Sequence, residues 1–243
     1  RTAGDLSAVH VIEIGPGPGG LTRALLNAGA KAVIAVEKDE RCLPIIEEIR
    51  SRADGRLIVI EADAMEIDIA TLAPPPRKIV ANLPYNVGTA LLLLWLDAIY
   101  RDPGAFVSLT LMFQKEVADR IVAGPGNKDY GRLTVLSQWL CECRHDFDLP
   151  PEAFVPPPKV HSSVVTLTPR AKPLMDVKKN AVEKVMAAAF GQRRKMLRSA
   201  LKSLGVDTEA LLSKAGIDPA LRAEQVDVVT LCGLAKLYQE DRA

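Results

Sequence analysis

Short apolar segments alternate with helical patterns over the first 140 residues of the chain. The apolar segments are rich in Val and Ile, as expected of strands that are buried on both faces of a parallel sheet. Strands that alternate with helices of this length form βαβ units, so the pattern predicts a doubly wound α/β domain. The predicted strands are Val9–Ile14, Ala32–Val36, Leu57–Ile60, Lys78–Ala81 and Phe106–Met112, and the predicted helices are Gly20–Ala28, Glu40–Arg50, Thr89–Tyr100 and Arg132–Leu140.

The pattern changes in the second half of the chain. Residues Phe147–Lys159 hold five prolines, which exclude a helix or a central strand and predict an irregular loop. One more strand is predicted over His161–Thr168, and from Val177 onward every segment has a helical pattern. We therefore expect an α/β domain over residues 1–170 and a small all-helical domain over residues 174–243.

Composition places the chain among ordinary globular proteins. Of its 243 residues, 48% are hydrophobic and 25% are charged, which argues against disorder and against a disulfide scaffold. The longest apolar run, Ala90–Leu96, is far shorter than the roughly 20 residues of a membrane span. Four scattered cysteines do not match a zinc-binding pattern, so no metal site is expected. With no secretory signal at its start, the sequence favours an intracellular, cytoplasmic protein without a membrane partner.

The formal net charge of +1 hides an asymmetry between the two predicted domains. Residues 170–243 carry 14 Lys and Arg against nine Asp and Glu, a net charge of +5, which leaves −4 for residues 1–169. The total gives no reason to expect a polyanionic partner, but the basic C-terminal region does.

A glycine-rich turn follows the first predicted strand and opens the first predicted helix. Gly15, Gly17 and Gly20 satisfy the dinucleotide-binding spacing, and Glu37 lies 20 residues beyond Gly17, where an acid that binds ribose is expected. This pattern alone permits an NAD enzyme, another nucleotide-like cofactor, or a tight turn without a ligand.

Two acidic residues favour a cationic cofactor over NAD. Glu13 lies at the carboxyl end of the first strand, two residues before Gly15, where its carboxylate would repel a pyrophosphate but would suit an amino group. Asp63, followed by Ala64, comes after the third strand and can accept a hydrogen bond from an adenine amine. S-adenosylmethionine, which joins a sulfonium, an amino acid and an adenosine, fits this set of residues.

The fourth predicted strand ends in Asn82-Leu83-Pro84-Tyr85, at the sheet edge where ligands of open α/β folds bind. The lone pair of an adenine amine is delocalised into the ring, so an enzyme must weaken that conjugation and aim the lone pair. The Asn82 side chain and a backbone carbonyl beside Pro84 can accept the two amine hydrogens. Tyr85 can stack on a base that has left its helix. These residue types favour methylation of an adenine amine.

Several further segments complete a resemblance that runs over nearly the whole chain. With them, the sequence resembles the KsgA-type ribosomal RNA adenine dimethyltransferases, a branch of the class I methyltransferases. The matching segments are Val11–Gly17, Asn82–Asn86, Gln114–Val117, Tyr130–Leu133, Ala153–Val160, Ala189–Lys195 and Gly216–Pro219.

The resemblance implies a role for each matching residue. Glu37 corresponds to the acid that binds ribose, Asp63 to the acid that binds adenine, and Asn82 to a residue shared by cofactor and target amine. Phe154 corresponds to an aromatic residue that faces the target base opposite the tyrosine. Gly15 and Gly17 match the loop around the methionine part of the cofactor.

The family resemblance also implies the reaction and the fold. We expect a monomer that dimethylates two adjacent adenines near the 3′ end of small-subunit ribosomal RNA, within a pre-ribosomal particle. The implied sheet is mostly parallel, with its last strand antiparallel. A methylase of large-subunit RNA that confers antibiotic resistance and a non-catalytic assembly or transcription factor are the alternatives. Family members carry a further N-terminal segment with a Phe-Gly-Gln-Asn-Phe-Leu-like motif, whereas this sequence starts shortly before its first strand.

A basic segment, Gln192–Ser203, contains five cations and no acid. Read as one helix, it places Met196 and Leu197 on an apolar stripe and its cations on the other side. Such a face can be merely solvated, but next to a base-modifying domain it favours contact with RNA phosphates. The candidate RNA-binding residues are Arg193, Arg194, Lys195, Arg198 and Lys202.

Overall fold

The computed structural model describes residues 2–242, which form two compact units. The first unit comprises the chain up to Ala118 together with Arg144–Pro169. The second comprises Asp119–Cys143 together with the chain from Arg170 onward. A segment from the middle of the sequence thus belongs with the C-terminal helices. The assignment of cofactor chemistry to residues 1–170 and RNA binding to residues 174–243 stays a prediction.

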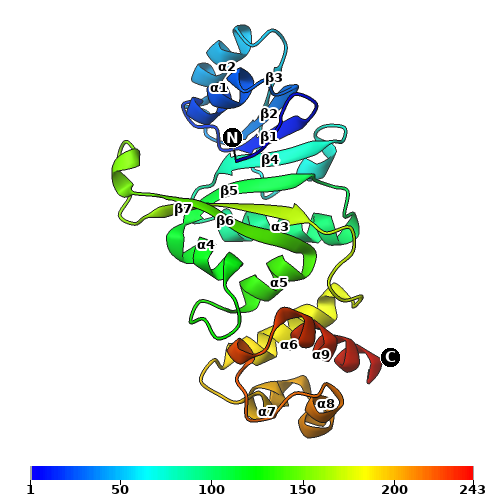
Figure 1. The fold of residues 1–243 in the computed structure, drawn as a ribbon. Coiled ribbons are helices and arrows are strands. Elements are labelled where there is room, and N and C mark those ends of the chain that lie inside the picture. Colours follow the sequence, from blue (N-terminus) through cyan, green and yellow to red (C-terminus); the bar gives the residue numbers. More distant parts are fainter. Residues whose placement is uncertain (1, 243) are drawn as a thin grey trace. The chain divides into compact units, whose positions relative to one another are not determined.

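Within residues 2–242, seven strands form a single sheet in the order β3-β2-β1-β4-β5-β7-β6 (Figure 1). The first five pair in parallel, and β7 runs antiparallel to β5, as predicted. The strands are β1 (His10–Ile14), β2 (Ala32–Glu37), β3 (Leu57–Glu61), β4 (Arg77–Asn82), β5 (Ser108–Gln114), β6 (Cys141–Leu149) and β7 (Ser162–Pro169).

Helices α1, α2 and α3 connect parallel strands and bury apolar side chains against the sheet. Leu25 of α1 and Ile46 of α2 join Val11 and Val33 of the sheet in one apolar cluster. α3 lies behind the sheet in the view of Figure 1 and buries Trp95. The helices that follow β1, β2, β4 and β5 are α1 (Gly20–Asn27), α2 (Leu43–Ser51), α3 (Gly88–Arg101) and α4 (Lys115–Val122).

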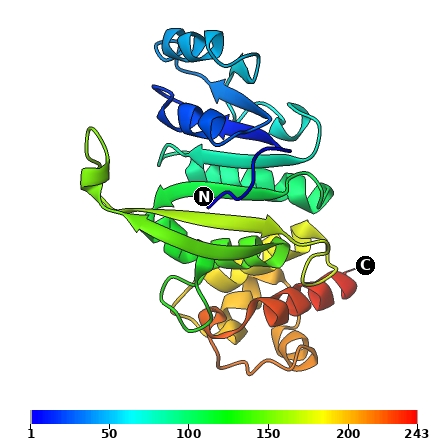
Figure 2. The same ribbon diagram turned by 45° about the horizontal axis from the view of Figure 1, so that its top comes forward.

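The second unit is helical and has its own core. Val182 and Met186 of α6 are fully buried, as are Leu231 and Leu234 of α9, and the two helices pack together (Figures 1 and 2). The Trp139 indole N–H donates to the Met175 carbonyl at 2.9 Å. The main helices of this unit are α5 (Arg132–Leu140), α6 (Lys179–Gly191), α7 (Leu197–Ala200), α8 (Thr208–Lys214) and α9 (Val228–Glu240). Over residues 2–242, no helix has the combined length and apolarity of a membrane span.

Two local expectations from the sequence were wrong. Residues Phe147–Leu149, expected in a loop, belong to β6, a strand at the sheet edge with mostly exposed side chains and therefore without an apolar pattern. The basic segment is not one helix, because α6 ends at Gly191 and residues 192–196 form a turn before α7. Met196 is accordingly exposed, whereas Leu197 is buried.

Candidate functional site

The glycine turn, Gly15–Gly20, leaves the carboxyl end of β1 in a conformation that favours glycine. Gly15 and Gly17 have φ angles of 66° and 53°, in the left-handed region that other residues rarely adopt. A Cβ on Gly17 would meet nothing within 4 Å, so its backbone angle, rather than crowding, explains the glycine. The Gly15 amide donates to the Val36 carbonyl at 2.9 Å, which ties the turn to β2.

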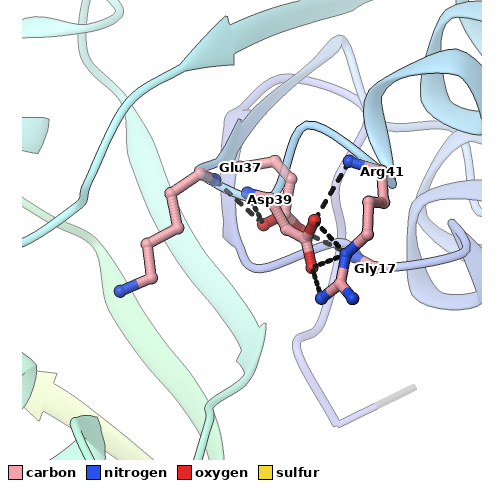
Figure 3. A network of polar contacts seen from close by, with 5 residues as sticks. Gly17, Glu37, Asp39 and Arg41 are labelled. Atoms are coloured by element: carbon pink, nitrogen blue, oxygen red, sulfur yellow. Dashed lines mark hydrogen bonds and ion pairs between the residues drawn. The ribbon is translucent and has the colours of Figure 1, made fainter.

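Glu37, at the end of β2, holds the same turn through its side chain (Figure 3). One carboxylate oxygen, Oε2, accepts a hydrogen bond from the Gly17 amide at 3.1 Å. The other, Oε1, accepts from the amides of Lys38 and Asp39, each at 2.9 Å. A carboxylate has about four acceptor sites, so Glu37 retains capacity for a ribose hydroxyl.

Glu13 is a buried acid with an unused acceptor oxygen. Its side chain is 1% exposed, Oε2 accepts from the Thr22 hydroxyl at 2.7 Å, and Oε1 has no partner among the described residues. Burial raises the pKa of Glu13 to about 7, against the opposing effect of the Thr22 bond, and the charge of Glu37 raises it further. A cationic ligand would supply the missing partner of Oε1.

Asp63 and Ala64 follow β3 at the same edge of the sheet, next to β2. Asp63 Oδ1 accepts from the Met65 amide at 2.9 Å, which is the main reason that the pKa of Asp63 is lowered. Asp63 Oδ2 pairs with the exposed Lys38 ammonium at 3.3 Å. An exposed pair of this kind contributes little, so an adenine amine can compete for that oxygen. Ala64 is buried.

A pocket of about 290 Å³ lies in the first unit, and we call it the base pocket because the sequence predicts that Tyr85 stacks on a base. It brings the two predicted aromatic residues, Tyr85 and Phe154, into the same lining, although they are far apart in the sequence. Phe154 belongs to the loop between β6 and β7, which extends beyond the sheet in Figures 1 and 2. The lining residues are Asn82, Leu83, Pro84, Tyr85, Met112, Phe154, Pro156 and Pro158.

The glycine turn lies against the base pocket. A Cβ built on Gly15 would stand 3.8 Å from Cδ of Pro84, so the two segments are in van der Waals range. Leu83 is 2% exposed, and its side chain packs in the core. Its backbone is therefore the part that lines the pocket. Asn82 is exposed at the end of β4. The arrangement can hold a cofactor beside an extruded base.

Three residues that line the base pocket, and one beside the glycine turn, were not anticipated from the sequence. Met112 reaches the pocket because β4 and β5 pair with Asn82 opposite Met112, a register that only the sheet reveals. Pro156 and Pro158 were predicted only as parts of a loop and of a segment that matches the family, without a role of their own. Thr22, on the first turns of α1, was not singled out, although a hydroxyl seven residues after Gly15 lies near the glycine turn.

The five cations of the basic segment are all exposed but differ in their contacts. Arg193 donates to the carbonyls of Lys128 and Tyr130 and lies 3.6 Å from a Glu224 oxygen, so it ties the segment to its own unit. No ion pair within residues 2–242 involves the other four. These four are Arg194, Lys195, Arg198 and Lys202.

No group of three or more His, Cys, Asp or Glu side chains in the described part of the chain is arranged to hold a metal ion. The donor set at the sheet edge instead consists of two buried carboxylates and open glycine backbone. Glu13 and Glu37 fit S-adenosylmethionine, because a cation can pair with the first and ribose hydroxyls with the second.

The sequence pattern of the family described as ribosomal RNA adenine dimethylase matches residues 7–240 of this chain. Two curated relatives bear the name ribosomal RNA small subunit methyltransferase A. The relative from Jannaschia sp. is 57% identical over 240 residues, which cover 99% of this chain and 83% of the relative. The relative from Rhodospirillum rubrum is 56% identical over 236 residues, covering 97% of this chain and 80% of the relative.

Two solved structures have the same fold over nearly the whole chain. A dimethyladenosine transferase from Plasmodium falciparum superposes with a TM-score of 0.81 at 25% identity, covering 96% of this chain and 90% of that one. The 23S rRNA methyltransferase ErmE superposes with a TM-score of 0.70 at 26% identity, covering 98% and 94%. They confirm the predicted class I methyltransferase fold. This chain belongs to the ribosomal RNA adenine dimethylase family.

Proposed function

We propose that this chain transfers methyl groups from S-adenosylmethionine to the N6 amines of two adjacent adenines near the 3′ end of small-subunit ribosomal RNA. The observation that carries the proposal is that the glycine turn and the base pocket lie within van der Waals range of each other, at Gly15 and Pro84. Family membership and the printed names of the relatives support the same reaction.

The cofactor would lie along the carboxyl edge of β1, β2 and β3. The unpartnered Oε1 of Glu13 would pair with the positive charge of the methionine part of the cofactor. Glu37 would accept from the ribose, and Asp63 with the Ala64 backbone would meet the adenine ring. When bound, S-adenosylmethionine supplies a methyl group on a positively charged sulfur, which an amine nitrogen can attack.

The base pocket would receive one extruded adenine at a time. Tyr85 and Phe154 would stack on it, and the prolines of the lining would exclude water. Asn82 and the backbone carbonyl beside Pro84 would accept the amine hydrogens, which draws the lone pair out of conjugation. Catalysis then depends on position and desolvation, so a dedicated general base is not required.

The exposed cations of the basic segment would bind phosphates of the ribosomal RNA. Such contacts give affinity and register but do not identify a base. Arg194, Lys195, Arg198 and Lys202 suit this role because they keep their charge uncompensated, whereas Arg193 holds the segment in place. We expect the protein to act as a monomer on a pre-ribosomal small-subunit particle in the cytoplasm.

The test is incubation of the protein and labelled S-adenosylmethionine with unmethylated small-subunit particles and, separately, with large subunits, followed by mapping of the modified nucleotides. We expect two dimethylated adenines in the small-subunit RNA and none in the large subunit. Label confined to the large subunit would instead support the antibiotic-resistance methylase. If neither subunit becomes labelled although the protein binds the particles, the result would favour a non-catalytic factor.

A further inference from the structure

Tyr85 is anchored by a residue that lies far from it in the sequence. Its phenolic oxygen, Oη, is 2.6 Å from Oγ of Ser162, and either oxygen can donate the proton. Tyr85 is 37% exposed and lines the base pocket, whereas Ser162 is fully buried. The hydrogen bond thus connects a partly exposed side chain that lines the pocket to a buried residue of the sheet.

Ser162 is held firmly by the backbone around it. It begins β7, where it stands opposite Gln114 in the antiparallel pairing with β5. The ladder continues beyond the strand, because the Lys115 amide donates to the His161 carbonyl at 2.9 Å. A serine side chain has a single rotatable bond to its hydroxyl, so fixing the backbone leaves Oγ few positions.

The hydroxyl of Tyr85 has a use that stacking does not explain. Stacking on a base requires only the aromatic ring, and a phenylalanine would provide that ring without an O–H to satisfy. Tyr85 follows β4 in a turn, where its own backbone alone would leave the ring free to rotate about its side-chain bonds. The bond to Ser162 restricts that rotation without any bound base.

We propose that Ser162 is a positioning residue that holds the Tyr85 ring in place as one fixed wall for the extruded adenine. The proposal rests on the proposed function of the base pocket, but it does not depend on which ribosomal RNA supplies the adenine. A fixed wall aligns the amine nitrogen with Asn82 at the end of β4. Misplacement of a reacting group by about 1 Å can lower a rate about 100-fold.

Ser163 provides a matched control on the same strand. It is also fully buried, and its hydroxyl donates to Asp148 Oδ1 at 2.6 Å, the same length as the bond between Tyr85 and Ser162. Ser163→Ala therefore removes an equivalent buried hydroxyl bond from β7 without touching Tyr85. A purely structural contribution of Ser162 would make the two serine variants behave alike.

The experiment compares Ser162→Ala, Tyr85→Phe, the double variant, Ser162→Thr and Ser163→Ala with the unaltered protein. Rates of methyl transfer to ribosomal subunits are measured at saturating cofactor, together with cofactor affinity and melting temperature. We expect Ser162→Ala and Tyr85→Phe each to lower kcat about tenfold and the double variant to be no slower than either, because both remove the same bond. Ser162→Thr should restore most of the rate, and Ser163→Ala should stay within about twofold.

A direct readout of the ring is independent of substrate. In protein with ¹³C-labelled tyrosine, relaxation of the Tyr85 ring signals should show greater mobility in Ser162→Ala than in Ser163→Ala. Equal ring mobility in the two variants, or rate losses that multiply in the double variant, would overturn the proposal. If the unaltered protein methylates neither subunit, the proposed function fails, and ring mobility still decides whether Ser162 positions Tyr85.

Discussion

The glycine turn and the basic segment hold their charges in opposite ways. At the glycine turn, the carboxylates of Glu13 and Glu37 are buried and bonded to Thr22 and to backbone amides. In the basic segment, all five cations are exposed, and four of them make no ion pair within residues 2–242. Chemistry at one atom needs groups fixed to a fraction of an ångström, whereas phosphate binding tolerates long, solvated side chains.

This difference predicts that substitutions near the pocket change rates or cofactor binding, while those in the basic segment change RNA affinity. Four predictions test it, in order of decreasing effect.

Asn82→Ala should lower methyl transfer to small-subunit particles at least about 100-fold, because the amine loses an acceptor needed as its lone pair develops. Particle binding should stay within about twofold. Single-turnover methylation and a filter-binding assay measure the two quantities, with Asn27→Ala on α1 as the matched asparagine control. Near-normal methylation by Asn82→Ala would refute the role given to this residue.

Glu13→Gln should change how stability and cofactor binding depend on pH. The pKa of Glu13 is raised from 4.5 to about 7, so between these values the folded protein keeps a proton that the unfolded chain releases. The free energy of unfolding therefore falls as pH rises through this window, by up to about 3 kcal/mol. Above about pH 7, the ionisation of Glu13 causes no further decrease. Glu13→Gln should remove this decrease and melt higher than the unaltered protein at pH 8.

Cofactor affinity should show the opposite trend, because a cation binds the ionised carboxylate. Calorimetry should find tighter binding by the unaltered protein as pH rises through about 7, and weaker, pH-independent binding by Glu13→Gln. Glu209→Gln, which alters an exposed acid of α8, is the control. Identical pH profiles for Glu13→Gln and the unaltered protein would show that Glu13 does not titrate in this window.

Replacing both Arg194 and Lys195 with Ala should weaken particle binding about tenfold at physiological salt. The slope of log affinity against log salt should become shallower by up to about two, because two phosphate contacts are lost. The control removes two exposed cations elsewhere, Lys31 and Lys172, and should leave both quantities unchanged. If the slope of log affinity against log salt is unchanged when Arg194 and Lys195 are replaced, RNA binds on another surface.

Arg193→Ala should mainly reduce stability. It removes bonds to the carbonyls of Lys128 and Tyr130, and since Arg193 is half-exposed we expect a loss of about 1 kcal/mol, or a melting temperature lower by about 2–4 °C. Arg194→Ala should not change the melting temperature. If instead Arg193→Ala weakens RNA binding without a stability change, Arg193 belongs with the phosphate-binding cations.

The sequence allowed the core of the sheet and the family to be predicted because both depend on local signals. The strand His10–Ile14 is buried along its whole length and holds Val11, Ile12 and Ile14. The helix Arg132–Leu140 was found with the predicted bounds. The bend at Gln192–Met196 was missed because its cations suit a helix as well as a turn.

Contacts across the fold carried no such signal. Strand pairings bring Met112 to the base pocket and Ser162 to the hydroxyl of Tyr85, and neither residue type indicates a role on its own. Tertiary pairing, rather than periodicity, places them. The roles given to the individual site residues remain predictions, whereas the fold class and the family are confirmed.

The five prolines of residues 150–158 have a consequence for the RNA binding that we propose. Proline restricts the backbone in the unfolded chain as well as in the folded one, so much of the conformational entropy of this loop is lost before any RNA arrives. A glycine-rich loop would lose that entropy at each encounter. In the proposed function, the loop that carries Phe154 would therefore bind and release successive particles with little ordering at each cycle.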